Sequence, residues 1–533
     1  MSELNWRVEL TDGRSFAGTE QVTAGAVHIR CLLPEGIIRS VTGEMCFPAA
    51  EDERVFFNGF QSWSYSPEYT SKEKIRGLSH LPALGVRRFG LDRYGDNYFL
   101  PYPEKKGVFH GETWAYFRRG KEYRLVASLD EEPGYTILRY SFDTQWLRLE
   151  RDCAGLRCGG DFPVFDLYFA RGEEKPVFDG WFDAMGVKPR TLEPIAGYSS
   201  WYNRYEDIDE ECIWADLDHC APFLEPGDLF QVDDGWEPGV GDWLEPDGEK
   251  FPSGMKAAAD AIHEKGYRAG LWLAPFVARK GSKVYTEHPD WLLQVDGKPW
   301  YCGCNWGGFY SLDIDHPEVR DYLTRVFRRV LDEWGFDLVK LDFLYGAAPF
   351  GNEKETRAGR MIRAMDWLRE LCGDKLILGC GVPLAAAFGR VDYCRIGCDV
   401  GLDWDGSWLM QQTHRERVST RQSMTDTVFR RQLNGRAFLS DPDVFFLRTD
   451  NCRLSQRQKA ALAETNTLLG GVFLTSDDMA EYDAEQAAAY RRLRRLRKAQ
   501  DVRVETDRGV LLTYTIDGAG YKRQVLPAIG KKL

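Results

Sequence analysis

The segment of residues 338–344 is Leu338-Val339-Lys340-Leu341-Asp342-Phe343-Leu344. It is an apolar run suited to a buried strand, interrupted by one lysine and one aspartate two residues apart. Because side chains alternate along a strand, Lys340 and Asp342 lie on the same face. Opposite charges on a buried face cost free energy unless they are paired or used in chemistry. The segment therefore indicates either a structural ion pair near a strand end or a catalytic group at the mouth of a parallel barrel.

The composition indicates a globular chain of two or three domains. The chain has 533 residues, of which 43% are hydrophobic, and a formal net charge of −13. An acidic chain without a basic block is a poor candidate for binding nucleic acid or an anionic membrane surface. Its 17 tryptophans are consistent with a sugar-binding surface, although most tryptophans in any protein serve packing.

The termini and cysteines favour a cytoplasmic protein. The first residues carry no basic and apolar leader pattern, and no apolar run reaches membrane-spanning length. The 13 cysteines are odd in number and scattered, which suits a reducing compartment better than a disulfide framework. Neither Cys302-Gly303-Cys304 nor the Cys394/Cys398 pair has the spacing and histidine partners of a zinc site, so no metal is predicted.

Residues 1–190 have the pattern of an antiparallel β-sandwich, because their apolar segments are short, bounded by turns and without long helical periodicity. Examples are Val27–Leu33, Tyr123–Leu129 and Trp146–Glu150. The run Phe56–Ser66 combines aromatic residues with Asn58 and Gln61. It is consistent either with sandwich core followed by a turn or with a carbohydrate platform.

Residues 191–498 alternate apolar strands with amphipathic helices, which predicts a (β/α)8 TIM barrel. The helical stretches include Val319–Trp334, Ala358–Leu371 and Ala484–Arg497. Residues 499–533 follow as a small β domain. The eight predicted strands are Ile195–Trp201, Leu229–Asp234, Arg268–Pro275, Leu338–Leu344, Leu376–Cys380, Tyr393–Gly397, Ala437–Ser440 and Gly471–Leu474.

Polar and aromatic residues follow the predicted strands where each one ends. In a barrel these carboxyl ends converge on one pocket. Several carboxylates among them, together with lysine, arginine and tryptophan, suit a site that binds hydroxyl groups and the face of a ring. In chain order they are Trp201, Tyr202, Asp233, Asp234, Trp236, Trp272, Lys340, Asp342, Cys380, Arg395, Asp399, Asp441 and Asp443.

Two carboxylates from different strands are what glycoside hydrolysis requires. One attacks or supports the anomeric carbon, and the other donates a proton to the leaving oxygen. The two carboxyl groups need different environments, so that one stays ionised and the other holds a proton. Lys340 beside Asp342 favours a charged nucleophile, whereas the apolar neighbours Cys398 and Val400 suit a protonated Asp399. Taken alone, Asp399 is equally consistent with a helix N-cap.

Several motifs together resemble glycoside hydrolase family 36, the α-galactosidase group, over about residues 195–474. The order of the motifs and the order of the domains both match that family. The motifs are Val232-Asp233-Asp234-Gly235-Trp236, Gly270-Leu271-Trp272-Leu273-Ala274-Pro275, Leu312-Asp313-Ile314-Asp315-His316-Pro317-Glu318-Val319, Val339-Lys340-Leu341-Asp342-Phe343, Arg395-Ile396-Gly397-Cys398-Asp399 and Leu439-Ser440-Asp441-Pro442-Asp443.

The resemblance implies a role for each candidate residue. Asp342 is similar to the nucleophile of the family and Asp399 to its acid/base. Asp233 and Asp234 resemble the residues that bind the 4- and 6-hydroxyls of galactose. The remaining substrate-binding candidates, which are expected to line the pocket, are Trp63, Trp201, Tyr202, Trp236, Trp272, Lys340, Cys380, Gly381 and Arg395.

The loop after the fifth strand departs from the family pattern. Many members have Cys-Ser-Gly-Gly-Gly-Arg there, whereas this chain has Cys380-Gly381-Val382-Pro383-Leu384. By resemblance this loop faces the second carbon of the sugar. Gly381 either leaves room there for an acetamido group or only permits a tight turn.

These observations predict a retaining exo-α-galactosidase that acts on terminal α-galactosyl groups and needs no cofactor. An α-N-acetylgalactosaminidase with the same machinery and a galactosyl transglycosylase are the near alternatives. A sugar-binding module without catalytic activity would have no use for both a nucleophile and a proton donor, so the presence of both aspartates argues against this class. A metal-dependent barrel hydrolase would lack its usual histidine ligands. A homo-oligomer is compatible with the sequence, which does not indicate an oligomeric state.

Overall fold

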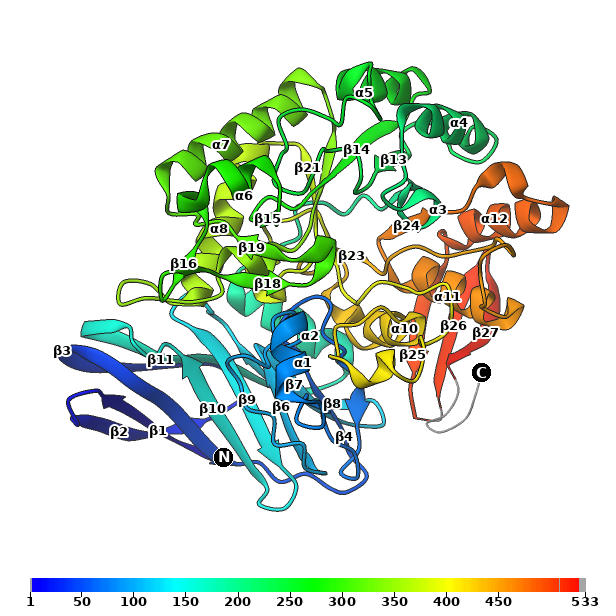
Figure 1. The fold of residues 1–533 in the computed structure, drawn as a ribbon. Coiled ribbons are helices and arrows are strands. Elements are labelled where there is room, and N and C mark those ends of the chain that lie inside the picture. Colours follow the sequence, from blue (N-terminus) through cyan, green and yellow to red (C-terminus); the bar gives the residue numbers. More distant parts are fainter. Residues whose placement is uncertain (1, 508, 527–533) are drawn as a thin grey trace.

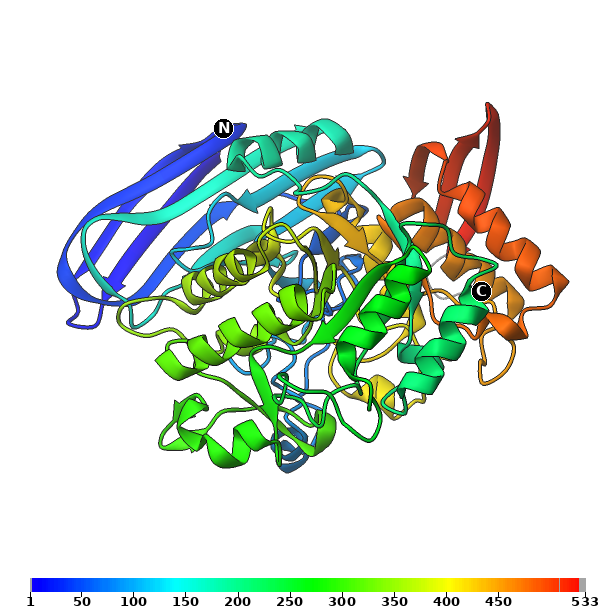
Figure 2. The ribbon, with the colours of Figure 1, turned by 90° about the horizontal axis from the view of Figure 1, so that it is seen from above.

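The computed structural model describes residues 2–507 and 509–526. Its N-terminal domain lies against one side of a central barrel, and a small β-sheet lies at the C-terminal end (Figures 1 and 2). This is the predicted architecture of a TIM barrel between β domains. Within the described residues, no helix has both the length and the apolar character needed to cross a bilayer.

The N-terminal domain is an antiparallel sandwich whose two layers share the long strand β3 (Gly25–Cys46). The first half of β3 pairs with β11 and the second half pairs with β1 and β10, so this strand passes from one layer to the other. Apolar side chains such as Val41, Phe109 and Phe165 fill the space between the layers. The prediction of uniformly short strands was therefore wrong for β3 and β11, which span 22 and 16 residues.

Two helices also belong to this part of the chain. α1 spans Ala83–Phe89, and α2 spans Glu174–Met185 and packs on β8 and β11. The indole of Trp181 donates a 2.8 Å hydrogen bond to the carbonyl of Ser128. The other strands are β1 (Ser2–Leu10), β2 (Ser15–Val22), β4 (Arg54–Phe57), β5 (Glu68–Tyr69), β6 (Val108–Glu112), β7 (Trp114–Arg119), β8 (Glu122–Ser128), β9 (Tyr135–Ser141), β10 (Trp146–Asp152) and β11 (Arg157–Gly172).

The barrel contains all eight predicted strands in parallel. The order around the sheet follows the chain, and β24 pairs with β12 to bring the eighth strand next to the first. The seventh and eighth strands are linked by a hydrogen bond from the Gly471 amide to the Ser440 carbonyl. The strands are β12 (Ile195–Ser199), β13 (Leu229–Val232), β14 (Arg268–Leu273), β20 (Leu338–Leu341), β21 (Leu376–Gly379), β22 (Tyr393–Arg395), β23 (Leu439–Asp441) and β24 (Val472–Thr475).

Helices cover the outside of the barrel. Most are capped at their N-termini by short polar side chains, for example Ser455 on α11 and Asp483 on α12, which both form capping boxes. Between β21 and β22 the structure describes only the single turn α9 (Leu384–Ala387). The main covering helices are α4 (Glu210–Cys220), α5 (Gly254–Glu264), α7 (Pro317–Arg328), α8 (Arg357–Cys372), α10 (Thr420–Phe429), α11 (Gln456–Leu469) and α12 (Ala484–Leu496).

A long excursion after β14 crosses the mouth of the barrel. It forms a three-stranded antiparallel sheet of β15 (Val277–Arg279), β18 (Tyr301–Gly303) and β19 (Phe309–Ser311). It also contains α6 (Lys283–Glu287) and the hairpin β16 (Gln294–Val295) and β17 (Lys298–Pro299). The excursion supplies part of the pocket wall, including Asn305 and Trp306.

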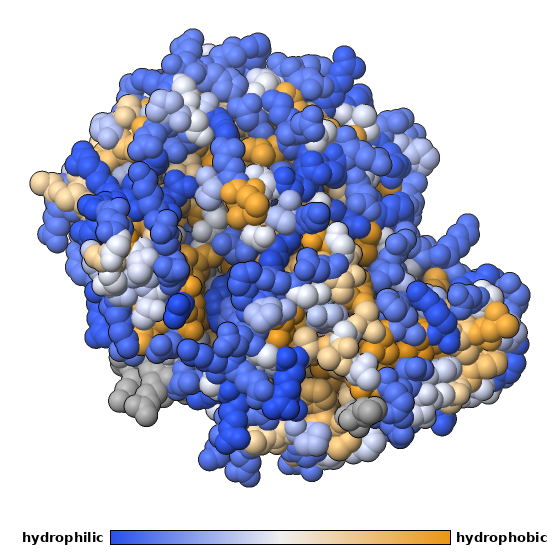
Figure 3. Space-filling model, turned by 180° about the vertical axis from the view of Figure 1, so that it is seen from behind, coloured by the Kyte–Doolittle hydropathy of each residue, from blue (hydrophilic) through white to orange (hydrophobic). Residues whose placement is uncertain are grey.

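In the residues that the structure describes, the C-terminal sheet has three antiparallel strands: β25 (Gln500–Glu505), β26 (Val510–Ile516) and β27 (Ala519–Leu526). Seen from behind in Figure 3, the molecular surface is mostly hydrophilic. Apolar residues show mainly at the lower right, over the N-terminal sandwich.

Candidate active site

A cavity of about 360 Å³ opens at the carboxyl ends of the barrel strands. This size suits a small ligand. Its walls combine carboxylates, two cationic side chains from β20 and β22, and several aromatic rings. The structure brings together in it most of the residues predicted from sequence, namely Trp63, Trp201, Tyr202, Asp233, Asp234, Trp272, Lys340, Asp342, Arg395 and Asp399.

Asp342 follows the last residue of β20 and is held by two N–H donors. The indole Nε1 of Trp272 donates to its Oδ2 at 3.1 Å, and the backbone N–H of Phe343 donates to its Oδ1 at 2.8 Å. Phe343 has a φ of 51°, in the left-handed region that bulky residues rarely adopt. Such strain persists where the surroundings impose it, which is common at functional sites. These contacts fix the direction in which the Asp342 carboxylate points.

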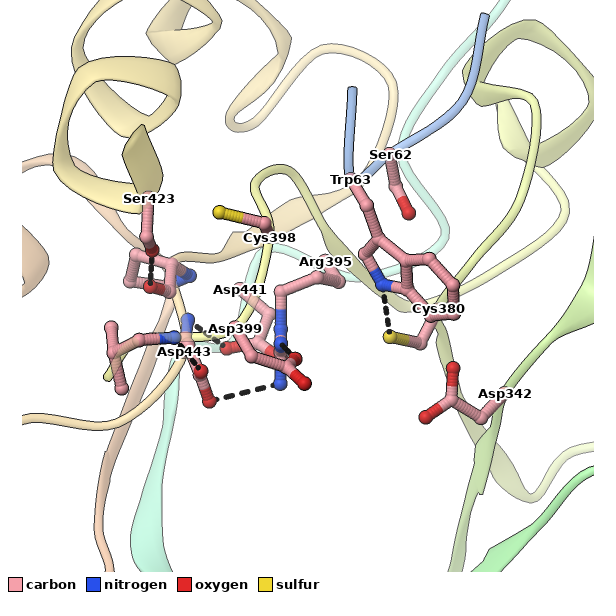
Figure 4. Close-up of polar contacts among 12 residues, drawn as sticks. Ser62, Trp63, Asp342, Cys380, Arg395, Cys398, Asp399, Ser423, Asp441 and Asp443 are labelled. Atoms are coloured by element: carbon pink, nitrogen blue, oxygen red, sulfur yellow. Dashed lines mark hydrogen bonds and ion pairs between the residues drawn. The ribbon is translucent and has the colours of Figure 1, made fainter. Parts of the chain in front are cut away.

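Asp399 lies after β22 and faces Asp342 across the cavity. Figure 4 shows the two carboxylates pointing toward one another over an open space. The Asp399 side chain is 40% exposed, on the side of the pocket, and its Oδ1 accepts a 2.6 Å hydrogen bond from Nη1 of Arg395. Although one side of this carboxyl faces the pocket, desolvation by the surrounding protein raises the pKa of Asp399 to about 6, against the opposing effect of Arg395. A carboxyl group with this pKa can hold a proton near neutral pH.

Arg395 joins three aspartates at the seventh-strand side of the pocket. Its Nε donates to Asp441 at 3.2 Å and its Nη2 donates to Asp443 at 2.9 Å, in addition to the bond with Asp399. Asp443 has a φ of 71° and also accepts hydrogen bonds from the hydroxyl of Tyr202 and the amide of Val400. Asp443 thus fixes both the arginine and the backbone beside Asp399.

The Lys340 ammonium pairs with Asp233, at 2.8 Å between Nζ and Oδ2. Asp342 takes its hydrogen bonds from Trp272 and Phe343, so the structural ion pair, one of the two interpretations of this segment, is not formed between Lys340 and Asp342. Burial disfavours a charged lysine, but the Asp233 carboxylate raises the pKa of Lys340 above its ordinary value. Lys340 therefore stays charged inside the pocket.

Asp234 is held by an aromatic residue from the excursion over the barrel mouth. Nε1 of Trp306 donates to Oδ2 of Asp234 at 2.9 Å. Burial raises the pKa of Asp234 to about 6, while hydrogen bonds from Glu237 and Trp306 oppose the shift. Glu237 lies buried behind it, outside the pocket. Asp233 and Asp234 together present carboxylate oxygens to the pocket, as hydroxyl recognition requires.

Trp236 was predicted to bind the substrate, and the structure corrects this prediction. It is fully buried and lies outside the pocket, packed edge-on against Trp334 and tilted against Trp243. Its Nε1 donates to the backbone carbonyl of Trp272 at 3.0 Å. Trp236 therefore supports the residue that contacts Asp342 and does not itself line the pocket.

The prediction that Cys380 and Gly381 line the pocket is also corrected, because the N-terminal domain covers them. The indole Nε1 of Trp63 donates to Sγ of Cys380 at 3.1 Å (Figure 4). A Cβ built on Gly381 would lie 2.9 Å from the Trp63 ring and 3.1 Å from Cα of Phe343. The space beside Gly381 is thus occupied by Trp63, and this tryptophan forms the pocket wall there.

The loop that carries Trp63 is bound firmly to the barrel. Arg430, after α10, donates to the carbonyl of Ser62 at 2.7 Å and to Oγ of Ser66 at 2.9 Å. The Ser66 amide in turn donates to Asp426 at 2.7 Å. The run Phe56–Ser66 contributes to the sandwich and to the pocket. Phe57 lies in the sandwich core and Trp63 lines the pocket, while carbohydrate binding by this run stays a prediction.

Sequence reasoning missed the pocket residues that lie on loops. They come from the segment after β12, the excursion after β14, the segment after β22 and a loop of the N-terminal domain. None lies at a strand end, and no periodic pattern marks them. The main ones are Tyr94, Glu206, Asn305, Trp306, Met410, His414, Glu416, Arg417 and Val418.

The family profile described as Melibiase matches residues 191–363. Alpha-galactosidase Mel36A from Lactobacillus acidophilus is 33% identical over 153 residues, which cover 27% of this chain and 20% of that protein. The alpha-galactosidase TtGalA from Thermus thermophilus, solved with p-nitrophenyl alpha-D-galactopyranoside, is 28% identical. That alignment covers 96% of this chain and 98% of TtGalA, with a TM-score of 0.75. The resemblance to glycoside hydrolase family 36 is confirmed.

The fold is shared still more widely. The family 36 alpha-galactosidase AgaA from Geobacillus stearothermophilus matches 96% of this chain with a TM-score of 0.57 at 14% identity, covering 80% of AgaA. At that identity the match supports the fold alone. The match to the curated relative Mel36A spans only about a fifth of that protein's length.

Proposed function

We propose that this protein is a retaining, exo-acting α-galactosidase. The observation that carries the proposal is the pair of Asp342 and Asp399, which project from different strands into one pocket. The family resemblance and the likeness to a galactoside-bound α-galactosidase support it.

The proposed reaction has two steps. Asp342 attacks the anomeric carbon while Asp399 gives its proton to the departing glycosidic oxygen, so the sugar becomes covalently attached to Asp342. Asp399, now ionised, then takes a proton from water, whose oxygen attacks the anomeric carbon and releases Asp342. Two displacements on the same carbon leave its configuration unchanged.

The other polar groups of the pocket suit recognition of a terminal sugar. Asp233, Asp234 and Lys340 offer acceptors and a cationic donor to ring hydroxyls, and Trp272 and Trp306 supply apolar ring surface. We assign Asp233 and Asp234 to the 4- and 6-hydroxyls, as the resemblance implies.

Galactose is the preferred sugar in this proposal. If the wall at Cys380 and Gly381 faces the second carbon, as the resemblance implies, then Trp63 fills the room that an acetamido group would need. A closed wall discriminates strongly against a bulkier group. The N-acetylgalactosaminide is therefore expected to be a poor substrate.

A panel of p-nitrophenyl glycosides tests the proposal. We expect the highest kcat/KM on the α-galactoside. A higher kcat/KM on the α-N-acetylgalactosaminide would overturn the sugar assignment and keep the two catalytic aspartates, whereas no release from either would overturn the enzyme class. Analysis of products at high galactoside concentration separates hydrolysis from transglycosylation.

We also propose a reducing, cytoplasmic location. All thirteen cysteines lie in the described part of the chain, and each is a free thiol there. Most are buried in apolar surroundings, as expected for cysteines that serve packing. Fractionation of the native host cells, with activity followed in each fraction, tests the location.

A further inference from the structure

The segment of residues 400–419 begins and ends beside Asp399. After leaving β22 the chain makes this long excursion before α10, and the amide of Ser419 donates a 2.9 Å hydrogen bond back to the carbonyl of Asp399. The hydroxyl of Thr420 bridges both backbone groups of Gly401, at 3.0 and 2.9 Å. The base of the excursion is thus tied to the proposed proton donor.

The excursion is held in shape by charged groups. The carboxylate of Asp405 accepts hydrogen bonds from Arg417 at 2.5 Å, from Arg421 at 2.8 Å and from Ser419 at 2.5 Å. From the N-terminal domain, Nε2 of His80 contacts the carbonyl of Gln412 at 2.9 Å. A segment fixed at its base, its middle and its outer end is preorganised to bind a ligand.

The side of this excursion that faces the pocket contains an exposed apolar part beside the polar residues His414, Glu416 and Arg417. Met410 and Val418 line the cavity and are 45% and 48% exposed, and the neighbouring Trp408 is 73% exposed. Leu409 beside them is also exposed. Exposed apolar residues at the rim of a polar pocket mark a binding surface when hydrogen bonds hold the segment that carries them in place.

We infer that residues 400–419 form the binding site for the leaving group, and that this site takes a group with an apolar face. The inference rests on the proposed function, because Asp399 must lie within hydrogen-bond reach of the leaving oxygen. The leaving group is consequently held beside Asp399. Val418 adjoins Ser419, whose amide donates to the Asp399 carbonyl, and Met410 lines the same cavity. The C–H face of a second sugar ring or an aryl ring matches these side chains, and Trp408 extends the surface outward.

The test compares substrates that differ only in the leaving group: α-galactosyl fluoride, p-nitrophenyl α-galactoside and melibiose. Fluoride is too small to reach the apolar wall. In the double variant Met410→Ala and Val418→Ala, we expect the kcat/KM for melibiose or the aryl galactoside, relative to the fluoride, to fall at least about fivefold. A greater loss on melibiose identifies a sugar as the fitting group, and a greater loss on the aryl galactoside identifies an aromatic one.

Leu32→Ala is the matched control, since Leu32 is an exposed apolar residue on β3 of the sandwich. It should leave the ratio at the wild-type value. A ratio that is likewise unaltered in the double variant, with active protein, overturns the leaving-group site alone. If wild-type protein turns over none of the three substrates, the proposed function itself has failed.

Discussion

Nη1 of Arg395 donates a 2.6 Å hydrogen bond to Oδ1 of Asp399. An arginine this close favours the ionised form of a carboxyl group, which is unexpected for a proton donor. Burial works in the opposite direction and is the largest influence on the pKa of Asp399. The carboxylates of Asp443 and Asp342 add to the effect of burial, while Arg395 and Lys340 oppose it, so that the pKa lies at about 6.

The pH dependence follows from this balance. Asp399 must be protonated to act, so the kcat/KM for melibiose should fall as the pH rises through about 6. Asp443→Asn removes a charge that raises the pKa of Asp399, and the fall should then begin at lower pH. Asparagine tolerates the left-handed backbone at this position.

Asp366→Asn is the control for this pH profile, because Asp366 pairs with Arg390 at the surface. Its profile should overlay that of the wild type. A profile for Asp443→Asn that is unmoved, or moved to higher pH, would contradict the assigned role of Asp399.

A side chain at position 381 should displace Trp63. Gly381 has a φ of 58°, and its Cβ position is blocked by Trp63 and Phe343. Gly373 has a similar φ of 53° and open space around it. Gly381→Ala and Gly373→Ala should each lose at least about 1 kcal/mol of unfolding free energy to backbone strain, and the contacts at Gly381 should add to its loss.

Activity separates the two glycine variants. Only Gly381→Ala should lower kcat/KM, because only there does the pocket wall move. Measurements of Tm and kcat/KM on both proteins check the prediction. Equal activities in the two variants would show that Trp63 does not shape the site.

Chelation should not affect turnover, because two carboxylates supply the proton transfer and the nucleophile. In the part of the chain that the structure describes, the group of side chains close enough to hold a metal ion is Asp216, His219 and Asp478. Arg204 pairs with Asp216 at 2.5 Å and already supplies positive charge there. Activity measured with EDTA checks this, and a loss that a divalent ion restores would refute the mechanism.

The asparagine variants of the two catalytic aspartates should lose activity in different ways. Asp342→Asn cannot form the covalent intermediate and should be inactive on every substrate. Asp399→Asn should lose about 10²–10⁴-fold on melibiose but less on the p-nitrophenyl galactoside, whose leaving group needs little protonation. Azide should accelerate release from Asp399→Asn. Equal losses on both substrates, with no azide effect, would reverse or void the assignment.

Much of the barrel and its site could be predicted from local sequence. Buried parallel strands appear as short apolar runs, and residues such as Asp342 and Arg395 at their carboxyl ends must converge once the barrel closes. The position of such a residue at the end of its strand was therefore enough to predict that its side chain enters the pocket, even though its contacts were unknown.

The remaining features depend on contacts between distant parts of the chain. Lys340 pairs with Asp233 from another strand, although Asp342 is nearer in sequence. Trp236 follows a strand end, yet neighbouring tryptophans bury it. Trp63 comes from another domain to fill the space at Gly381. No local pattern distinguishes these cases.

The stereochemistry of the first-formed product tests the central claim that Asp342 is a nucleophile assisted by Asp399. A double displacement places the two carboxyl groups about 5–5.5 Å apart, too close for an intervening water. Proton NMR of p-nitrophenyl α-galactoside hydrolysis, recorded before mutarotation, distinguishes the anomers. The account predicts α-galactose first. Initial β-galactose would mean a single displacement by water and would contradict the role of Asp342.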